Sequence, residues 1–455
     1  MTAFPAIRSA ASSAFTAFKI TFVILMSAQV SLVLAAPAAP AAPAAPAAPV
    51  ASAAAPRLLQ VGKARTLRTI AEAARVARDG DTVEIDAGDY VGDVAVWTQD
   101  HLTIRTLGGR AHLIANGAAA EGKAIWVVRG GVIAVENIDF DGARVADQNG
   151  AGIRFEGGHL TVRNCRFAGN ENGILTGNSS GTLEVADSEF RNNGTVSGQG
   201  HSIYVGQITQ LRISGTYIHQ AVGGHLLKTR AAENHILANR LTDEAGGKAS
   251  YELEFPNGGV NYVIGNIIEQ SSETENSTIV SMGGEGYHWP RNELYLVNNT
   301  IADDRPQGGV FVAVRPGAQA LQATNNLLVG LGKTDTGGAG NLLGDAGVRL
   351  DLASMKTSAR ALAKQIVGGT AQPAPPPALA GSMRNNHQAD WDQVMRAARY
   401  DYRLKPGSAL IGKAEASGSA NGVDLRQRLQ FTEPHGTAPL NAGALSVGAV
   451  QGAPR

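Results

Sequence analysis

Cysteine, aromatic residues and charged residues are all scarce in this chain, and their scarcity limits the possible folds and partners. Only one of the 455 residues is a cysteine, Cys165, so no intramolecular disulfide can form, and we expect this thiol to be a small buried filler. Aromatic residues make up 5%, so small aliphatic side chains must supply most of the core. Charged residues make up 17%, and the formal net charge is zero. Such a chain has no general attraction to nucleic acid or to an anionic membrane.

The N-terminal segment is typical of a Sec-type secretory signal. Arg8 and Lys19 precede an apolar run that ends in small residues, which predicts a signal peptide over 1–36. The run is about as long as the shortest membrane-spanning helix, so an uncleaved anchor is the alternative. Residues 37–56 repeat Ala and Pro and predict an extended linker. We therefore expect a bacterial monomer, secreted or periplasmic, without stable membrane association once the signal is cleaved.

Glycine is abundant, at 55 residues, and it accompanies a repeat of short apolar strands. Segments such as 135–140 and 162–167 return every 23 to 33 residues. A period in this range that is carried by strands predicts a coil of stacked rungs, in which residues one period apart become neighbours. We expect the third residue of each unit to occupy a turn, where Asn tolerates left-handed backbone. These residues are Asn137, Asn164, Asp187, Gly215, Ala238, Gly265, Asn298 and Asn325.

The two ends of this repeat resemble those of a known superfamily. Helical spacing over 66–78 is followed by Asp79-Gly80-Asp81 and by a first strand at 82–85. This stretch resembles the N-terminal cap of the pectate-lyase-like right-handed parallel β-helix proteins. The segment 400–412 resembles the closing motif of the same superfamily. The resemblance implies an all-β fold, a right-handed single-stranded parallel β-helix with an N-terminal capping helix and a C-terminal cap. It implies no single activity, because this fold carries several.

The repeat also divides the chain. We expect the parallel β-helix over 57–330, because the strand pattern is continuous there. Residues 331–380 lose the pattern and are rich in Gly, Ala and Pro, which predicts an irregular excursion. Order returns at 381–455, where we expect a final rung and the cap.

A second strand in each rung places polar residues side by side on one face. Alternation points one apolar residue inward in each strand: Ile153, Ile174, Ile203, Leu227, Leu253, Ile279 and Phe311. The next residue then faces outward, in the order Arg154, Leu175, Tyr204, Lys228, Glu254 and Val280. Three adjacent rungs thus present Tyr204, Lys228 and Glu254 about 4.8 Å apart. Arg230 and Glu252 are two residues away along two of these strands, so we expect both on the same face.

Further polar residues surround this group. His201 and His225 lie at the starts of two of the strands. The longest interval of the repeat, 33 residues, contains a loop at 282–290, and long loops of this kind commonly wall a groove. We therefore expect the following residues to contact a substrate: Tyr251, Glu252, Glu254, Asn257, Glu285, His288 and Trp289.

These side chains suit β-elimination from an acidic polysaccharide. Cleavage beside a uronate needs a cation on its carboxylate, a base for the C5 proton and an acid for the leaving oxygen. We expect Arg230 to hold the carboxylate at two points and Lys228 to be the base. Tyr204 or His201 would be the acid, with His225 beside them. The chain lacks the acidic cluster of pectate lyases and the Asp-Pro-His-Asp of alginate epimerases, so this prediction rests on residue types.

The same residues are also compatible with a calcium site and with two other functions. Several lyases of the resembled superfamily use Ca²⁺, and Glu252 with Glu254 would be its ligands here. The same two carboxylates, roughly 6.5 to 7 Å apart on one strand face, could instead be the acid and base of a glycoside hydrolase. The Asp-rich motifs of β-helix polygalacturonases are absent, which disfavours that alternative. A non-catalytic polysaccharide-binding module is the third reading.

Overall fold

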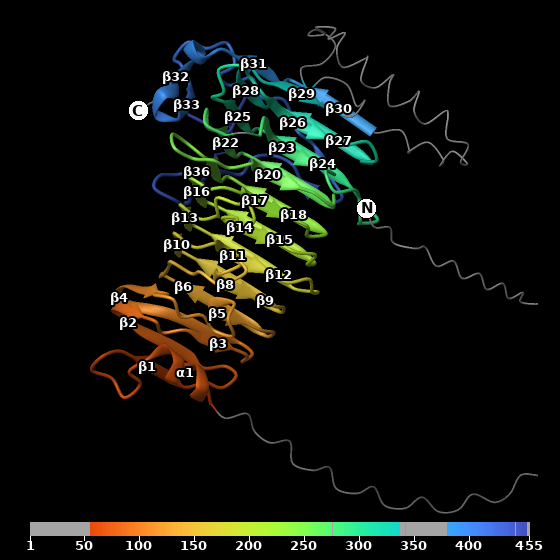
Figure 1. Ribbon diagram of the computed structural model, residues 1–455. Coiled ribbons are helices and arrows are strands. Elements are labelled where there is room, and N and C mark those ends of the chain that lie inside the picture. The colour runs from red at the N-terminus through yellow and green to blue at the C-terminus, as the bar shows by residue number, and fades with distance from the viewer. Residues whose placement is uncertain (1–54, 275, 337–341, 343–379, 442, 453–455) are drawn as a thin grey trace, which may run out of the picture. The chain divides into compact units, whose positions relative to one another are not determined.

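The chain winds into a coil of parallel strands (Figure 1). The computed structural model describes residues 55–274, 276–336, 342, 380–441 and 443–452. Most rungs contain three strands, such as β8 (Ala151–Phe155), β9 (His159–Arg163) and β10 (Arg166–Ala168). The predicted all-β parallel β-helix is confirmed. The predicted signal peptide and all but the last two residues of the linker lie outside the described residues.

The first strand of each rung belongs to a sheet of ten parallel strands that carries the predicted site. In chain order these strands are β3 (Ala95–Trp97), β5 (Ala124–Val128), β8, β11 (Asn172–Thr176), β14 (Ile203–Val205), β17 (His225–Thr229), β20 (Tyr251–Phe255), β23 (Thr278–Met282), β26 (Val310–Val314) and β29 (Lys333–Asp335). β29 lies within the segment for which an irregular excursion was expected, and it pairs with β26.

The other two strands of each rung form a sheet of 21 strands. They join because the long strand β4 (Leu102–Ile114) pairs with both β6 (Val132–Glu136) and β7 (Ile138–Asp141). The sheet begins with β1 (Leu58–Val61) and β2 (Thr82–Val91). Its remaining members, besides β9 and β10, are β12 (Thr182–Ala186), β13 (Glu189–Arg191), β15 (Gln210–Ser214), β16 (Tyr217–His219), β18 (Glu233–Leu237), β19 (Arg240–Thr242), β21 (Val260–Ile264), β22 (Ile267–Gln270), β24 (Glu293–Val297), β25 (Thr300–Asp303), β27 (Ala320–Thr324), β28 (Leu327–Gly330), β30 (Ala380–Arg384) and β31 (His387–Ala389).

A single short α-helix lies at the N-terminal end among the described residues. Helix α1 (Ile70–Val76) is shorter than the expected 66–78, because Thr69 caps it. The Thr69 hydroxyl accepts the N–H of Glu72, and the Glu72 carboxylate accepts the N–H of Thr69. The carboxylate of Asp93 accepts the first two backbone N–H groups of the helix. None of the described helices combines the length and apolar character that a membrane span requires.

The corners between the second and third strands of each rung repeat one backbone conformation. All eight predicted turn residues have positive φ, from 49° at Asp187 to 70° at Gly265, which confirms the expectation. From Ala238 onward, the residue that follows each corner residue is a buried Asn. The side chains of these Asn residues form a ladder: Asn239, Asn266, Asn299, Asn326 and Asn386. In Asn266, Nδ2 donates to Ile236 O at 2.7 Å and to Asn299 Oδ1 at 3.1 Å. Its Oδ1 accepts the backbone N–H and Nδ2 of Asn239.

We expect Asn266→Ala to lower the free energy of unfolding by about 3 kcal/mol, because it leaves several buried groups without partners. The midpoint of urea or thermal unfolding measures this. Asn164→Ala is the matched control, since Asn164 occupies a corner on the surface, and it should cost about 1 to 2 kcal/mol. Equal losses in the two variants would contradict a stabilising role for the buried ladder.

The core is mainly aliphatic, with one short aromatic stack near the N-terminal end. Phe140, Phe167 and Phe190 stack with ring centroids 4.9 and 4.5 Å apart. Trp126 meets Phe140 edge-on at 5.1 Å. Cys165 is buried as expected, and burial raises the pKa of its thiol to about 12.

The register of the ten-stranded sheet departs from expectation after β20. Leu253 pairs with Val280 rather than with Ile279, whereas β23 and β26 keep the expected register, with Val280 opposite Val312. The outward column therefore runs from Glu254 to Ser281, and the expected place of Val280 in it is wrong.

The C-terminal region closes the coil and then runs back along it. Its elements are two 3₁₀-helices, η2 (Trp391–Gln393) and η3 (Ala397–Arg399), and the strands β32 (Val394–Arg396), β33 (Asp401–Leu404), β34 (Ser419–Ala420), β35 (Val423–Asp424), β36 (Leu429–Phe431) and β37 (Thr437–Pro439). We call residues 413–449 the C-terminal strap. Asn325 Nδ2 donates to Glu415 O at 2.9 Å, and Gly436 N–H donates to Gly215 O at 2.7 Å. The strap thus passes many rungs, and β36 lies beside β16 (Figure 1).

Candidate functional site

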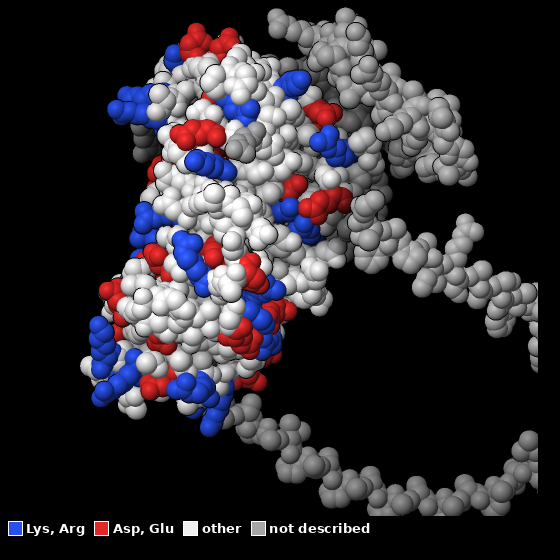
Figure 2. Space-filling model, in the orientation of Figure 1, with Lys and Arg blue, Asp and Glu red and all other residues white. Residues whose placement is uncertain are grey.

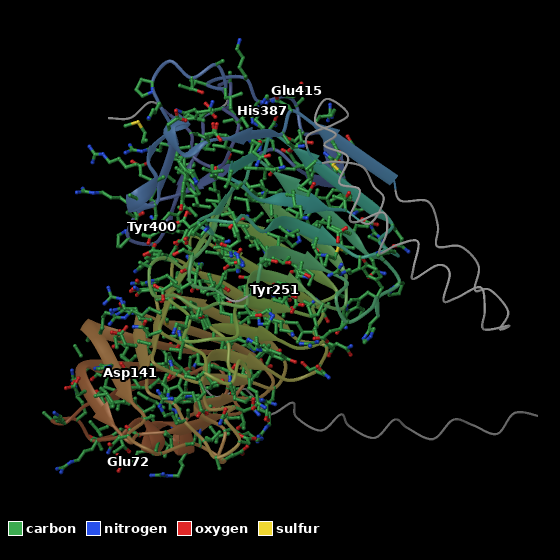
Figure 3. The ribbon with its side chains drawn as sticks, turned by 45° about the horizontal axis from the view of Figure 1, so that its top comes forward. Glu72, Asp141, Tyr251, His387, Tyr400 and Glu415 are labelled. Carbon is green, nitrogen blue, oxygen red and sulfur yellow. The ribbon has the colours of Figure 1, made fainter. Side chains whose placement is uncertain are left out.

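The ten-stranded sheet brings the predicted polar residues together on the outward surface of β14, β17 and β20. The Cα register places Tyr204 beside Lys228, and Lys228 beside Glu254, as expected. His225 is in register with Tyr251, which lies near the middle of the coil (Figure 3). We call the following residues the polar cluster: His201, Tyr204, His225, Lys228, Arg230, Tyr251, Glu254 and Glu285.

Two cations and two carboxylates form a continuous chain of ion pairs in the polar cluster. Lys228 Nζ lies 3.1 Å from Glu254 Oε2 and 3.0 Å from Glu285 Oε1. Arg230 Nη2 donates to both oxygens of Glu285, at 2.8 and 2.7 Å. The side chains of Lys228 and Arg230 are 13% and 15% exposed, so these are partly desolvated contacts. Both cations are therefore engaged in this structure, and Lys228 is not a free amine.

The carboxylates of the polar cluster are held in their ionised form. Burial alone would raise the pKa of Glu254, but the contact with His225 and the charge of Lys228 outweigh it and hold that pKa below its usual range. Burial likewise opposes ionisation of Glu285, and the hydrogen bonds from Arg230 and Lys228 again leave its pKa lowered. Each cation of the cluster thus faces a negative charge.

The two histidines contact one another. His201 Nδ1 accepts the backbone N–H of His225 at 3.0 Å, and the two Nδ1 atoms lie 3.2 Å apart. His225 Nε2 lies 2.9 Å from Glu254 Oε2. Burial, followed by the charges of His225 and Lys228, lowers the pKa of His201 well below its usual range. Because its Nδ1 is an acceptor, neutral His201 carries its proton on Nε2.

Aromatic rings pack on these groups rather than standing free. The Tyr204 ring stacks on His201 with centroids 5.2 Å apart, and the Arg230 guanidinium lies 5.0 Å from the Tyr204 ring centroid. Tyr251 stacks on His225 at 5.0 Å. Tyr204 thus packs on His201 and Arg230, and Tyr251 packs on His225.

The long loop after β23 reaches the polar cluster through Glu285. Its backbone is fixed beside β20, because His288 N–H donates to Asn257 O at 3.0 Å. Trp289 Nε1 donates to Arg230 O at 3.0 Å, and the ring of His288 lies 3.2 Å from Gln207 Nε2. Among the predicted substrate contacts, Trp289 and His288 therefore position the loop. Asn257 is 2% exposed, and its contact with a substrate stays a prediction.

Glu252 is the clearest departure from the expected site. It is 0% exposed and points into the coil, so the prediction that it shares a face with Glu254 is wrong. The alternation fails because two consecutive residues near the start of several of these strands, such as Leu226 and Leu227, both enter the core. Burial first, and then the charges of Asp243 and Glu269, raise the pKa of Glu252 well above its usual range.

Because Glu252 points inward, it cannot act together with Glu254 as an acid and base pair or as a pair of calcium ligands. Glu252 and Glu254 cannot flank one glycosidic bond, because one is inside the coil and the other on its surface. They also cannot hold one Ca²⁺ ion together. Among the described residues, no group of three or more His, Cys, Asp or Glu side chains is arranged to bind a metal.

A pocket next to the polar cluster was missed by the sequence reasoning. It has a volume of about 500 Å³ and is lined by Tyr204 together with Arg154, Asn149, Asn172, Asn178 and Gln199. Arg154 lies in the outward column, two strands before Tyr204. Its position could therefore have indicated a binding site here. Figure 2 shows positive and negative side chains interspersed over the visible face, as the zero net charge predicts.

A family model matches part of the chain, and some solved structures are similar to it. No curated protein sequence matches the chain. Among solved structures, the chain is similar to the pectate lyase Pel9A, with 13% identity and a TM-score of 0.44 over 88% of this chain and 97% of that one. It is also similar to ORF18 of Geobacillus virus E2, with 10% identity and a TM-score of 0.39 over 68% and 53% of the two chains. The family described as the right handed beta helix region matches residues 103–268, so the parallel coil is a right-handed β-helix.

Proposed function

We propose that the polar cluster binds an acidic, uronate-containing polysaccharide and cleaves it by β-elimination outside the cytoplasm. One observation carries this proposal. A carboxylate, that of Glu285, already sits across Lys228 Nζ and Arg230 Nη2 at 2.7 to 3.0 Å. These cations are therefore positioned to take a carboxylate at that place, and a uronate would replace Glu285.

The surroundings of this carboxylate position suit a polymer. Parallel strands about 4.8 Å apart make a long, nearly flat face along which a chain of sugars can lie. The loop that carries Glu285 stands at one side of that face, since its backbone is fixed to residues 256–257. A polymer bound along β14, β17 and β20 would meet the cluster and the loop together.

The steps of the reaction follow from the positions of the groups. Arg230 neutralises the uronate carboxylate, which makes the C5 proton more acidic. Lys228, once it has released its own proton to solvent, takes the C5 proton. The C4–O bond breaks as a double bond forms between C4 and C5. The leaving oxygen takes a proton from the Tyr204 hydroxyl or from His201 Nε2–H.

A second candidate function is a non-catalytic polysaccharide-binding module. The observation that favours it is the engagement of both cations with both carboxylates, which leaves no free base in this state. A hydrolase is disfavoured, because Glu252 lies inside the coil.

The test is an assay of the unsaturated uronate product by its ultraviolet absorbance. Polygalacturonate, alginate and a glucuronan are each incubated with the protein, with added Ca²⁺ and with a chelator. New absorbance on one polymer supports β-elimination. New reducing ends without absorbance would show hydrolysis instead. Binding without either product would assign the binding module.

We expect Glu285→Gln to strengthen binding of acidic oligosaccharides about tenfold at low salt, because it removes the charge that competes for Arg230 and Lys228. The gain should shrink as salt is added. Calorimetric titration with an oligouronate measures the dissociation constant. Glu273→Gln removes an exposed charge elsewhere and is the control. Weaker binding by Glu285→Gln would show that Glu285 contacts the sugar rather than occupying its place.

A further inference from the structure

The pocket beside Tyr204 differs from the polar cluster in the chemistry of its lining. Arg154, Asn149, Asn172, Asn178 and Gln199 line it together with Tyr204, and no Asp or Glu is among the residues that do so. Its lining thus offers one guanidinium and several carboxamides. These groups recognise anions and hydroxyl groups.

Two donors of this pocket lack partners among the described residues. Asn172 is 1% exposed, its Oδ1 accepts the N–H of His201 at 3.0 Å, and its Nδ2 has no hydrogen-bond partner. Arg154 Nε is also buried and without a hydrogen bond. A buried donor without a partner is costly, so each one indicates a group that is satisfied in another state.

The positive charge of Arg154 is poorly neutralised. The ion pair between Arg154 and Glu156 is long, at 3.9 Å. The carboxylate of Glu156 is instead held by Lys123 at 2.7 Å and by Arg129 at 2.8 Å. Arg154 therefore contrasts with Arg230, whose guanidinium has close contacts with both oxygens of a carboxylate.

We propose that this pocket is a second carboxylate-binding subsite, in which Arg154 holds the carboxylate of another uronate in the same polymer and Asn172 Nδ2 donates to one of its oxygens. The inference rests on the proposed function, since it places the same polymer along the same face. Arg154 and Lys228 are three strands apart in register, or about 14 Å. An oligomer of several sugars reaches both places.

The test is calorimetric binding of hexagalacturonate and hexamannuronate, each compared with its fully methyl-esterified form. All proteins carry Lys228→Ala, so that cleavage does not interfere. In this background Arg154→Gln should weaken binding of the acidic oligomer about tenfold or more and leave the ester unchanged. Arg154→Lys should give a smaller loss, because it keeps the charge but not the two-point contact. The matched control is Arg163→Gln, an exposed Arg at the end of β9 on the other sheet.

The outcomes separate this inference from the proposed function. Tight binding of the acid that is unaffected by Arg154→Gln, or lost equally in Arg163→Gln, overturns the subsite alone. Equal affinity for acid and ester also overturns it. The wild-type protein is titrated separately with each acidic oligomer and polymer, and no binding of any of them overturns both proposals. An unchanged thermal midpoint in each variant shows that a loss of affinity does not come from unfolding.

Discussion

Lys228→Ala is expected to lower the turnover of an acidic polysaccharide by about 10²- to 10⁴-fold, the usual contribution of a general base. Lys228 Nζ lies between Glu254 and Glu285, and no other amine is part of the polar cluster. The initial rate of ultraviolet absorbance on the active polymer measures the loss. Because the base acts in the chemical step, kcat should fall much more than KM changes.

The control for this variant is Lys248→Ala. Lys248 is exposed in the turn before β20, so its removal takes away one positive charge near the coil without touching the polar cluster. Turnover by Lys248→Ala should match that of the wild type. Wild-type turnover by Lys228→Ala would exclude Lys228 as the base and leave His225 with Glu254 as the remaining pair.

Glu252→Gln is expected to stabilise the protein at neutral pH and to leave its stability unchanged near pH 4. The folded chain keeps the proton on buried Glu252, because burial raises the pKa of this carboxyl well above its usual range. The unfolded chain releases that proton above about pH 4.3. Wild-type stability is therefore lost as the pH rises from about 4 towards the folded pKa, by about 1.4 kcal/mol per unit. Glutamine cannot ionise and avoids this loss.

Unfolding by urea at several pH values measures the difference between the two proteins. Glu415→Gln is the control, since Glu415 is exposed on the C-terminal strap and its substitution leaves the buried carboxyl of Glu252 in place. Parallel curves for Glu252→Gln and wild type would mean that Glu252 is ionised in the folded protein.

The sequence alone was sufficient to predict the fold and the row of outward residues at the centre of the candidate site. Apolar anchors such as Leu227 and Leu253 repeat at nearly constant spacing, and each fixes the register of its strand against the core. Each anchor is followed by an outward residue, so the spacing of the anchors makes neighbours of Tyr204, Lys228 and Glu254. The same reasoning predicted the left-handed corners, because only a few residue types tolerate positive φ there.

The errors arise where the strand geometry leaves strict alternation or where contacts join distant segments. At the start of β17 both Leu226 and Leu227 enter the core, and Glu252, which lies opposite Leu226 on β20, is buried with them. A strict period of two does not predict two consecutive inward side chains. The partner of Lys228 and Arg230 was equally hidden, since Glu285 is 57 and 55 residues away on a loop.

The C-terminal strap should change how this coil unfolds. A solenoid is held together by neighbouring rungs only, so it can fray from either end one rung at a time. Here the strap links Gly436 to Gly215 and Glu415 to Asn325, across many rungs. The last rungs therefore cannot peel away without also pulling the strap off the middle of the coil. The strap therefore links rungs that would otherwise unfold one after another into one cooperative unit.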